Sequence, residues 1–234
     1  HAYKNTIFMR NLQKKIKDLI ILIINLIPVA IIYSCFRLYI MMIQELSILI
    51  PVYNDNATML VKSLSKQAQA ISGLCYEIIV FDDGSTDLTS VEINKTLTLL
   101  PHCRYVNVEH HDCRAAMRND MFKQAKYDWH LMIDARLTLM NDDFLMRYLC
   151  CGVQVGEVAC GGVCVDGGLL TAQLYSENLR FRYEKHEESK HSYIVRKSEP
   201  YKAFRTTNFF YHKSVLKQVP YNEQVKGYGY EDVL

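Results

Sequence analysis

The chain of 234 residues lacks the marks of several protein classes. It contains no G-x-G-x-x-G, no Walker loop and no G-x-S-x-G, which argues against dinucleotide binding, ATP binding and hydrolase chemistry. Charge of one sign is not in excess, because 27 Lys and Arg stand against 25 Asp and Glu. Nucleic-acid binders usually carry a basic excess, so we expect no nucleic-acid partner. Hydrophobic residues make up 50% of the chain, which excludes a disordered, collagen-like or coiled-coil protein.

Cysteine occurs eight times but never as a C-x-x-C pair. The spacing of Cys160 and Cys164 has no matching second pair, which disfavours a zinc site. A chain of this length buries enough surface to hold a core without disulfides. Several cysteines lie inside apolar runs, where a thiol behaves as a small hydrophobe. We therefore interpret them as reduced thiols and expect a cytoplasmic protein.

One apolar block is long enough to cross a bilayer. Residues 19–43 contain only four residues that are not apolar, and a lysine cluster at 14–17 precedes them, as on the cytoplasmic side of a membrane anchor. A cleavable signal peptide fits less well, because the block is too long and lacks a small-residue cleavage site.

Pro28 and Arg37 lie inside this block and weaken the membrane-spanning interpretation. In addition, only Gln44 and Glu45 separate the block from the first predicted strand. Three interpretations stay open: a membrane anchor that places the protein at the inner face of the membrane, an interfacial or packing helix, and residues upstream of the true start. We divide the chain into an N-terminal hydrophobic segment, 1–45, and one domain, 46–234.

Strand and helix patterns alternate from residue 46 to residue 134. Short runs of aliphatic and β-branched residues are typical of strands buried on both faces, and the spacing of apolar residues between them predicts helices. This alternation predicts an α/β fold with a mostly parallel central sheet and helices on both faces. The expected order is strand 46–53, helix 57–71, strand 76–81, helix 86–99, strand 104–108, helix 114–126 and strand 129–133.

Beyond residue 140 the pattern is less regular. Asp142 and Asp143 are interpreted mainly as caps of a short helix at 144–149. The other expected pieces are β-like segments at 158–165, a solvated helix and loop over 177–205, a strand at 209–211 and a helix at 213–218.

Polar residues follow three of the predicted strands, in the clusters Pro51-Val52-Tyr53-Asn54, Asp82-Asp83-Gly84-Ser85 and Asp134-Ala135-Arg136. In open α/β sheets ligands bind beyond the carboxyl ends of the strands, so these clusters predict a crevice lined by carboxylates. Such a crevice binds a phosphate through a divalent metal, or accepts hydrogen bonds from hydroxyl and N–H groups. Both fit a nucleotide joined to a sugar. Taken alone, the second cluster also fits a turn with a helix cap.

The order and spacing of these motifs resemble family 2 glycosyltransferases of the GT-A fold. The motifs are P-V-Y-N at 51–54, D-D-G-S-T-D at 82–87, R-A-x-x-R-N at 114–119, D-A-x at 134–136 and G-Y-G-x-E-D at 227–232. The last of them resembles a galactosyltransferase-like subgroup. The resemblance covers roughly residues 46–234 and implies a GT-A-type Rossmann-like sandwich.

The resemblance also implies an activity. The protein would move a sugar, with inversion, from a nucleotide-sugar donor to a saccharide or lipid-linked acceptor, as in polysaccharide biosynthesis. UDP is the expected nucleotide. Mn²⁺ or Mg²⁺ would neutralise the leaving diphosphate.

Individual residues take roles from the same resemblance. Pro51, Val52 and Tyr53 would flank the base, and Asp83 or Asp82 would accept a hydrogen bond from uracil or ribose. Asp134 would lie at the diphosphate and ligate the metal. Asp232 would be the general base, with Glu231 beside it, because an inverting transfer needs a carboxylate to take the acceptor proton. The other expected site residues are Asn54, Ser85, Arg114, Asn119 and Arg136 for the donor, and Asn208, Tyr228, Gly229 and Tyr230 for the acceptor or sugar.

Arg136 departs from the family pattern, because the D-x-D motif normally ends in a second carboxylate that ligates the metal. A cation there repels a metal but can pair with a phosphate. Three outcomes stay open: Asp134 and other groups hold the metal weakly, Arg136 partly replaces the metal, or activity is lost.

Two further expectations complete the prediction. His110 and His111 are interpreted as loop surface, since adjacent histidines on a strand point in opposite directions. The chain begins with His1 and ends two residues after Asp232, so we expect a fragment whose catalytic domain, 46–234, is truncated at its C-terminus. The rival functions are a non-catalytic sugar-nucleotide binding module and, more distantly, a nucleotidyltransferase.

Overall fold

The structure, a computed structural model, describes residues 43–165, 168–190, 192–200 and 204–225. The chain divides into two units at residue 42, and the described residues all belong to the second, 43–234. The apolar block at 19–43 therefore lies almost entirely outside the described residues, and its three interpretations stay predictions. Within the described ranges, no helix combines the length and the apolar character that a membrane span requires.

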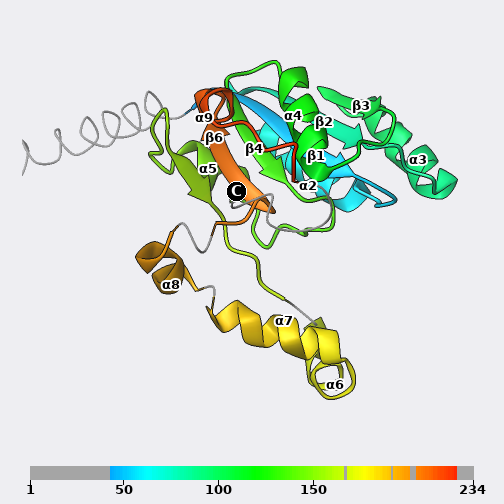
Figure 1. The fold of residues 1–234 in the computed structure, drawn as a ribbon, viewed down its shortest axis with the longest axis vertical. Coiled ribbons are helices and arrows are strands. Elements are labelled where there is room, and N and C mark those ends of the chain that lie inside the picture. The colour runs from blue at the N-terminus through cyan, green and yellow to red at the C-terminus, as the bar shows by residue number, and fades with distance from the viewer. Residues whose placement is uncertain (1–42, 166–167, 191, 201–203, 226–234) are drawn as a thin grey trace, which may run out of the picture. The chain divides into compact units, whose positions relative to one another are not determined.

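Strands and helices alternate through the first half of the domain (Figure 1). The strands are β1 (Glu45–Val52), β2 (Cys75–Asp82), β3 (Cys103–Asn107), β4 (Trp129–Ile133), β5 (Val158–Cys160) and β6 (Asn208–His212). The helices are α2 (Thr58–Ala70), α3 (Leu88–Lys95), α4 (Arg114–Gln124), α5 (Phe144–Leu149), α6 (Thr171–Glu177), α7 (Leu179–Lys190), α8 (Tyr193–Ser198) and α9 (Ser214–Gln218). Two 3-10 turns, Thr96–Leu99 and Gly168–Leu170, complete the described elements.

The six strands form one sheet in the order β3-β2-β1-β4-β6-β5. β1 pairs in parallel with β2 on one side and with β4 on the other, and β3 pairs in parallel with β2. β6 is antiparallel to both β4 and β5. The chain therefore builds outward from β1 in one direction and then returns to the other side of β1. Such a reversal of strand order opens a crevice at the carboxyl ends of the two strands that flank it, here β1 and β4.

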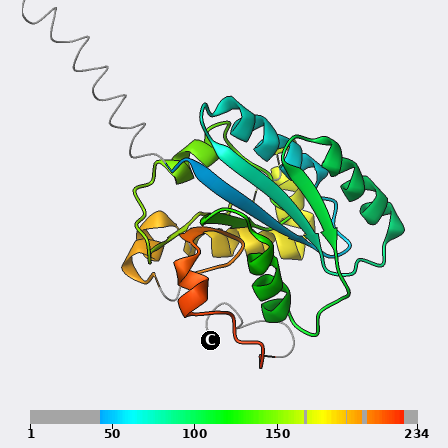
Figure 2. The ribbon, with the colours of Figure 1, turned by 90° about the horizontal axis from the view of Figure 1, so that it is seen from above.

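Helices cover both faces of this sheet (Figure 2). On one face, α4 and α9 contribute Met117, Met121 and Leu216 to a core cluster with Leu49, Ile79, Phe81, Met132, Phe209 and Tyr211 from the strands. Helix α2 buries Leu60, Val61 and Leu64 and contacts β2 and α5. β1, β2 and β4 are thus buried on both sides, which explains why these segments appear as continuous hydrophobic runs, whereas β3 lies at the edge of the sheet and is only partly buried.

The predicted α/β fold is confirmed, and the expected elements from 46 to 133 all form with boundaries shifted by a few residues. Two local predictions are wrong. The β-like piece at 158–165 is a strand only over Val158–Cys160. Asp143 occupies the cap position of α5 but makes no side-chain cap; its carboxylate instead accepts 2.9 Å hydrogen bonds from Arg147 one turn later.

Candidate functional site

A cleft of about 160 Å³ lies where the strand order reverses, at the carboxyl ends of β1, β2 and β4. Three aspartates and three arginines line it, so its fixed charges nearly balance. The predicted carboxylates are therefore present in the cleft, but an equal number of guanidinium groups lies beside them, so the cleft is not acidic. Its lining residues are Pro51, Val52, Tyr53, Asp55, Asp83, His110, Arg114, Met117, Arg118, Asp134, Arg136 and Thr206.

Asp83 forms one end of the cleft together with two histidines. Its carboxylate lies 3.0 Å from His110 Nδ1 and 2.5 Å from His111 Nδ1, and it also accepts a 3.0 Å hydrogen bond from the His111 backbone N–H. The His110 ring lies 4.8 Å from the ring of Tyr53, centroid to centroid. Asp83, His110, His111 and Tyr53 are named the base end of the cleft below.

His110 and His111 lie in a loop, as predicted, and the His110 side chain is 58% exposed. The sequence did not predict that both rings turn to the same carboxylate. The two residues follow β3, which pairs in parallel with β2, so the loop after β3 lies beside the loop after β2. Gly84 makes this approach possible: its φ is +72°, and a Cβ there would lie 2.7 Å from the backbone nitrogen of His110. Such a contact is too short for any residue with a side chain.

Arg136 lines the cleft on the other side of β1 from Asp83, because it follows β4 whereas Asp83 follows β2. Its Nε lies 3.9 Å from Asp55 Oδ2 and 4.0 Å from Asp134 Oδ1. Burial raises the pKa of Asp55 above its ordinary value of 3.8, the Arg136 cation lowers it in part, and the charge of Asp134 raises it further. One exposed cation is thus held near two carboxylates by long ion pairs. These three residues are named the phosphate end below.

The loops that carry Asp83 are fixed by a second set of polar residues. Asp82 is fully buried; its carboxylate accepts a 2.7 Å bond from the backbone of Ser85 and another from the hydroxyl of Tyr105. Burial, followed by that bond to Asp82, raises the pKa of Tyr105 to about 12. The Asn54 side chain accepts 2.8 Å bonds from the backbone of Thr86 and Asp87. Asp82, Asn54 and Ser85, all expected at the donor, therefore shape the loops instead of lining the cleft.

Helix α4 places two more expected residues differently. Arg114, at its first position, lines the cleft. Asn119 does not line the cleft. Its side-chain amide donates to the carbonyl of Tyr221 at 2.9 Å and to Glu223 Oε1 at 2.8 Å, and its Oδ1 accepts a 3.0 Å hydrogen bond from the Tyr221 N–H. Asn119 thus ties α4 to the segment that precedes residue 226.

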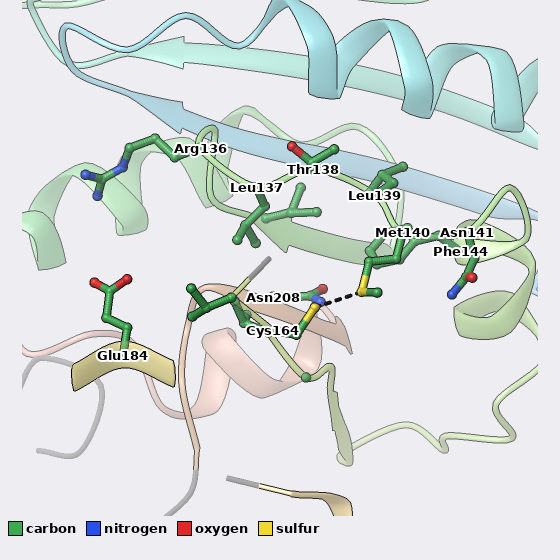
Figure 3. A pocket seen from close by; sticks show the side chains of 14 residues that line it. Arg136, Leu137, Thr138, Leu139, Met140, Asn141, Phe144, Cys164, Glu184 and Asn208 are labelled. Carbon is green, nitrogen blue, oxygen red and sulfur yellow. Dashed lines mark hydrogen bonds between the residues drawn. The ribbon is translucent and has the colours of Figure 1, made fainter. Parts of the chain in front are cut away.

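A larger cavity of about 700 Å³ adjoins the cleft and shares Arg136 with it (Figure 3). Its wall includes Leu137, Leu139, Met140 and Phe144, and Figure 3 shows Arg136 and Glu184 at one end with Met140 and Phe144 at the other. Asn208, expected at the acceptor or sugar, lines this cavity and accepts a 2.7 Å bond from Tyr148. The cavity therefore offers a mainly apolar surface beside the phosphate end.

With this geometry in place, comparison with known proteins is decisive for one part of the chain. Residues 47–155 match the family model for glycosyl transferase family 2. This segment belongs to that family. The family 2 segment carries β1 to β4 and eleven of the twelve residues that line the cleft, all but Thr206.

Solved structures share the fold of the chain. The mannosyltransferase PcManGT from Pyrobaculum calidifontis, in complex with GDP-Man and Mn²⁺, is 15% identical with a TM-score of 0.51, covering 81% of this chain and 50% of that one. Glucosyl-3-phosphoglycerate synthase from Mycobacterium tuberculosis, in complex with phosphoglyceric acid, is 18% identical with a TM-score of 0.50, covering 80% and 62%. These two similarities confirm the predicted GT-A fold.

S. aureus TarS 1-349 is 19% identical with a TM-score of 0.48, covering 80% of this chain and 52% of that one. The chain thus spans about half the length of the solved structures that it matches, and at most 62% for the three named here. No curated protein sequence matches the chain.

The expected divalent cation would need ligands at the phosphate end of the family 2 segment. Asp134 and Asp55 supply carboxylate oxygens there, but the Arg136 guanidinium lies within 4.0 Å of both. In the part of the chain that the structure describes, no three His, Cys, Asp or Glu side chains gather to hold a metal ion. A magnesium ion is usually bound by one or two carboxylates together with substrate phosphates and water, and here the Arg136 guanidinium already faces both carboxylates, so it competes with a cation for them.

The last expected residues lie beyond the described ranges. They are Tyr228, Gly229, Tyr230, Glu231 and Asp232. Their roles at the acceptor stay predictions.

Proposed function

We propose that the protein is a glycosyltransferase that uses a nucleotide-sugar donor. The observation that carries this proposal is the cleft at the reversal of strand order, with Tyr53 and Asp83 at one end and Arg136 at the other. An aromatic face and a carboxylate suit a base, and guanidinium groups suit a diphosphate. The family 2 segment and the shared fold support the same class of reaction.

The donor we propose is a UDP-sugar. Uracil presents an N–H that a carboxylate can accept, and Asp83 is the cleft carboxylate beside the aromatic pair of Tyr53 and His110. The structure of PcManGT contains GDP-Man, which supports a nucleoside diphosphate sugar as the donor class. Guanine also presents N–H donors, so Asp83 suits either base, and offering both nucleotides tests the choice of uracil.

Transfer is proposed to invert the anomeric carbon, with Asp232 as the base. The acceptor hydroxyl loses its proton to the Asp232 carboxylate while its oxygen attacks the anomeric carbon. The bond between that carbon and the donor phosphate breaks, and the nucleoside diphosphate leaves with the electron pair. The acceptor is proposed to be a saccharide or a lipid-linked saccharide, and the apolar cavity beside the cleft is the place where such a group would lie.

The proposed reaction does not use a metal ion, because the carboxylates of Asp134 and Asp55 already face Arg136. The PcManGT structure contains Mn²⁺, so metal ions are varied in the test below. A nucleotide-binding module without catalysis, the rival function, is one of its outcomes.

The test is a transfer assay with UDP-sugars and GDP-sugars, in Mn²⁺, in Mg²⁺ and in EDTA, with saccharide and lipid-linked acceptors. In Asp232→Asn we expect transfer to fall by about 10²-fold or more, since a positioned base contributes at least that much, while donor affinity is kept. Asp143→Asn is the control, because Asp143 pairs with Arg147 outside the cleft. Nucleotide binding without transfer under every condition would favour the binding module, and equal loss of affinity and transfer would remove Asp232 from its role.

A further inference from the structure

Arg136 is held in place by the backbone turn that follows β4. The Asp134 N–H donates a 2.9 Å bond to the carbonyl of Thr207, and the Leu137 N–H donates a 3.1 Å bond back to the carbonyl of Asp134. These two hydrogen bonds therefore fix the backbone of residues 134–137 and, with it, the Cα position of Arg136. Both Asp134 and Arg136 line the cleft from this turn.

The guanidinium group is held by charge, without hydrogen bonds that use up its donors. Among the described residues its ion-pair partners are Asp55 and Asp134, at 3.9 and 4.0 Å, which is beyond hydrogen-bonding distance. The Arg136 side chain is 66% exposed. Its planar fork of N–H donors is therefore available to a ligand that enters the cleft.

A guanidinium in this position competes with a divalent cation for the same two carboxylates. A metal ligated by Asp55 and Asp134 would be placed against a like charge within a few ångströms. A phosphate, in contrast to a metal ion, is attracted to the guanidinium group, because two of its oxygens match the guanidinium N–H donors. Arg114 and Arg118 line the same cleft.

We propose that Arg136 binds the donor diphosphate directly, so that the protein binds its nucleoside diphosphate without a divalent cation. Asp55 and Asp134 keep the guanidinium at the cleft and leave its fork to the phosphates. This inference rests on the proposed function, since it assumes that the cleft takes a nucleoside diphosphate.

The experiment measures the Kd of UDP and of GDP by calorimetry, in EDTA and in Mn²⁺. For the unaltered 234-residue chain we expect the same affinity in both conditions. Arg136→Ala should weaken binding by about tenfold or more, as expected for the loss of charge-assisted hydrogen bonds. The affinity of Arg136→Lys should lie between that of the unaltered chain and that of Arg136→Ala, because lysine keeps the positive charge but lacks the planar pair of N–H donors.

Arg136→Asp is the most discriminating variant, since it supplies the second carboxylate of a D-x-D metal site. We expect this variant to lose binding in EDTA and to recover it in Mn²⁺. Arg147→Ala is the matched control: Arg147 is also 66% exposed and pairs through Nε with an aspartate, but it lies outside the cleft. Thermal unfolding of each variant confirms that the fold is kept.

The outcomes separate the inference from the function beneath it. Binding by the unaltered chain only in Mn²⁺, or equal binding by Arg136→Ala, would overturn the role of Arg136 and leave the proposed function standing. Failure of both nucleotides to bind in any condition would overturn the proposed function, and the inference would fall with it. Metal-independent binding that Arg136→Ala weakens and Arg136→Asp makes metal-dependent would establish the inference.

Discussion

The two ends of the cleft are built in different ways. At the base end, Asp83 is nearly buried and contacts two histidines at 3.0 Å or less, and Gly84 brings the loops together. At the phosphate end, Arg136 is largely exposed and is held by two contacts of about 4 Å. Close contacts among buried groups are costly to disturb, whereas exposed ion pairs contribute little to stability. The base end is therefore preorganised, and the phosphate end can adjust to its ligand.

The largest expected effect is at the base end. Asp83→Asn should weaken UDP binding by about 10-fold to 100-fold, because under the proposed function it removes the charged acceptor of a hydrogen bond from the base. Calorimetry checks this, with Asp143→Asn as an exposed control outside the cleft. Unchanged affinity in Asp83→Asn would show that the base lies elsewhere.

A second substitution tests the rigidity of the base end. Gly84→Ala should lower the free energy of unfolding by about 2 kcal/mol or more, from the positive φ and from the clash with His110. Gly152→Ala is the matched control, because Gly152 has a φ of +75° with nothing within 4 Å of the added Cβ. Urea unfolding measures both variants. An equal loss in the two would mean that the contact between the loops contributes nothing.

The free energy of unfolding should hardly respond to a substitution at the phosphate end. Arg136→Ala should change the free energy of unfolding by no more than about 0.5 kcal/mol, since an exposed ion pair is worth little. Urea unfolding beside Gly84→Ala makes the comparison direct. A loss as large as that of Gly84→Ala would abolish the distinction between the two ends.

The smallest effect is a shift in one titration. Burial raises the pKa of Asp55 above 3.8, so its charged form is disfavoured in the folded state, and its contribution to stability improves as the pH falls through the raised pKa. Because the Arg136 cation lowers that pKa in part, Arg136→Ala should raise it further. Carboxyl carbon chemical shifts across a pH titration measure the change. A pKa that stays constant would show that Arg136 and Asp55 are not coupled.

The first half of the fold was predictable because three of its strands, β1, β2 and β4, are buried on both faces. Such strands appear as short apolar runs, and the residues after them fall at one edge of the sheet by the geometry of parallel pairing. Pro51, Asp83 and Asp134 were placed in this way, and the structure brings all three into one cleft.

The remaining site residues depended on information that the sequence does not carry locally. His110 and His111 reach Asp83 because β3 lies beside β2, which requires the strand order to be known. Asp82 and Asp83 are adjacent, yet Asp82 ends β2 and is buried against Tyr105, while Asp83 faces the cleft. Asn119 matches the family motif but bonds the backbone near Tyr221, a hundred residues away. In each case a tertiary contact decided the role.

The cleft is encoded almost entirely by one continuous stretch of the chain. Eleven of its twelve lining residues lie between Pro51 and Arg136, and the remaining one is Thr206. The adjoining cavity draws instead on residues up to Asn208. A genetic recombination event downstream of residue 136 would therefore exchange much of that cavity while inheriting the cleft nearly whole. With the donor in the cleft and the acceptor in the cavity, as proposed, such an exchange would change the acceptor while the binding of the donor is kept.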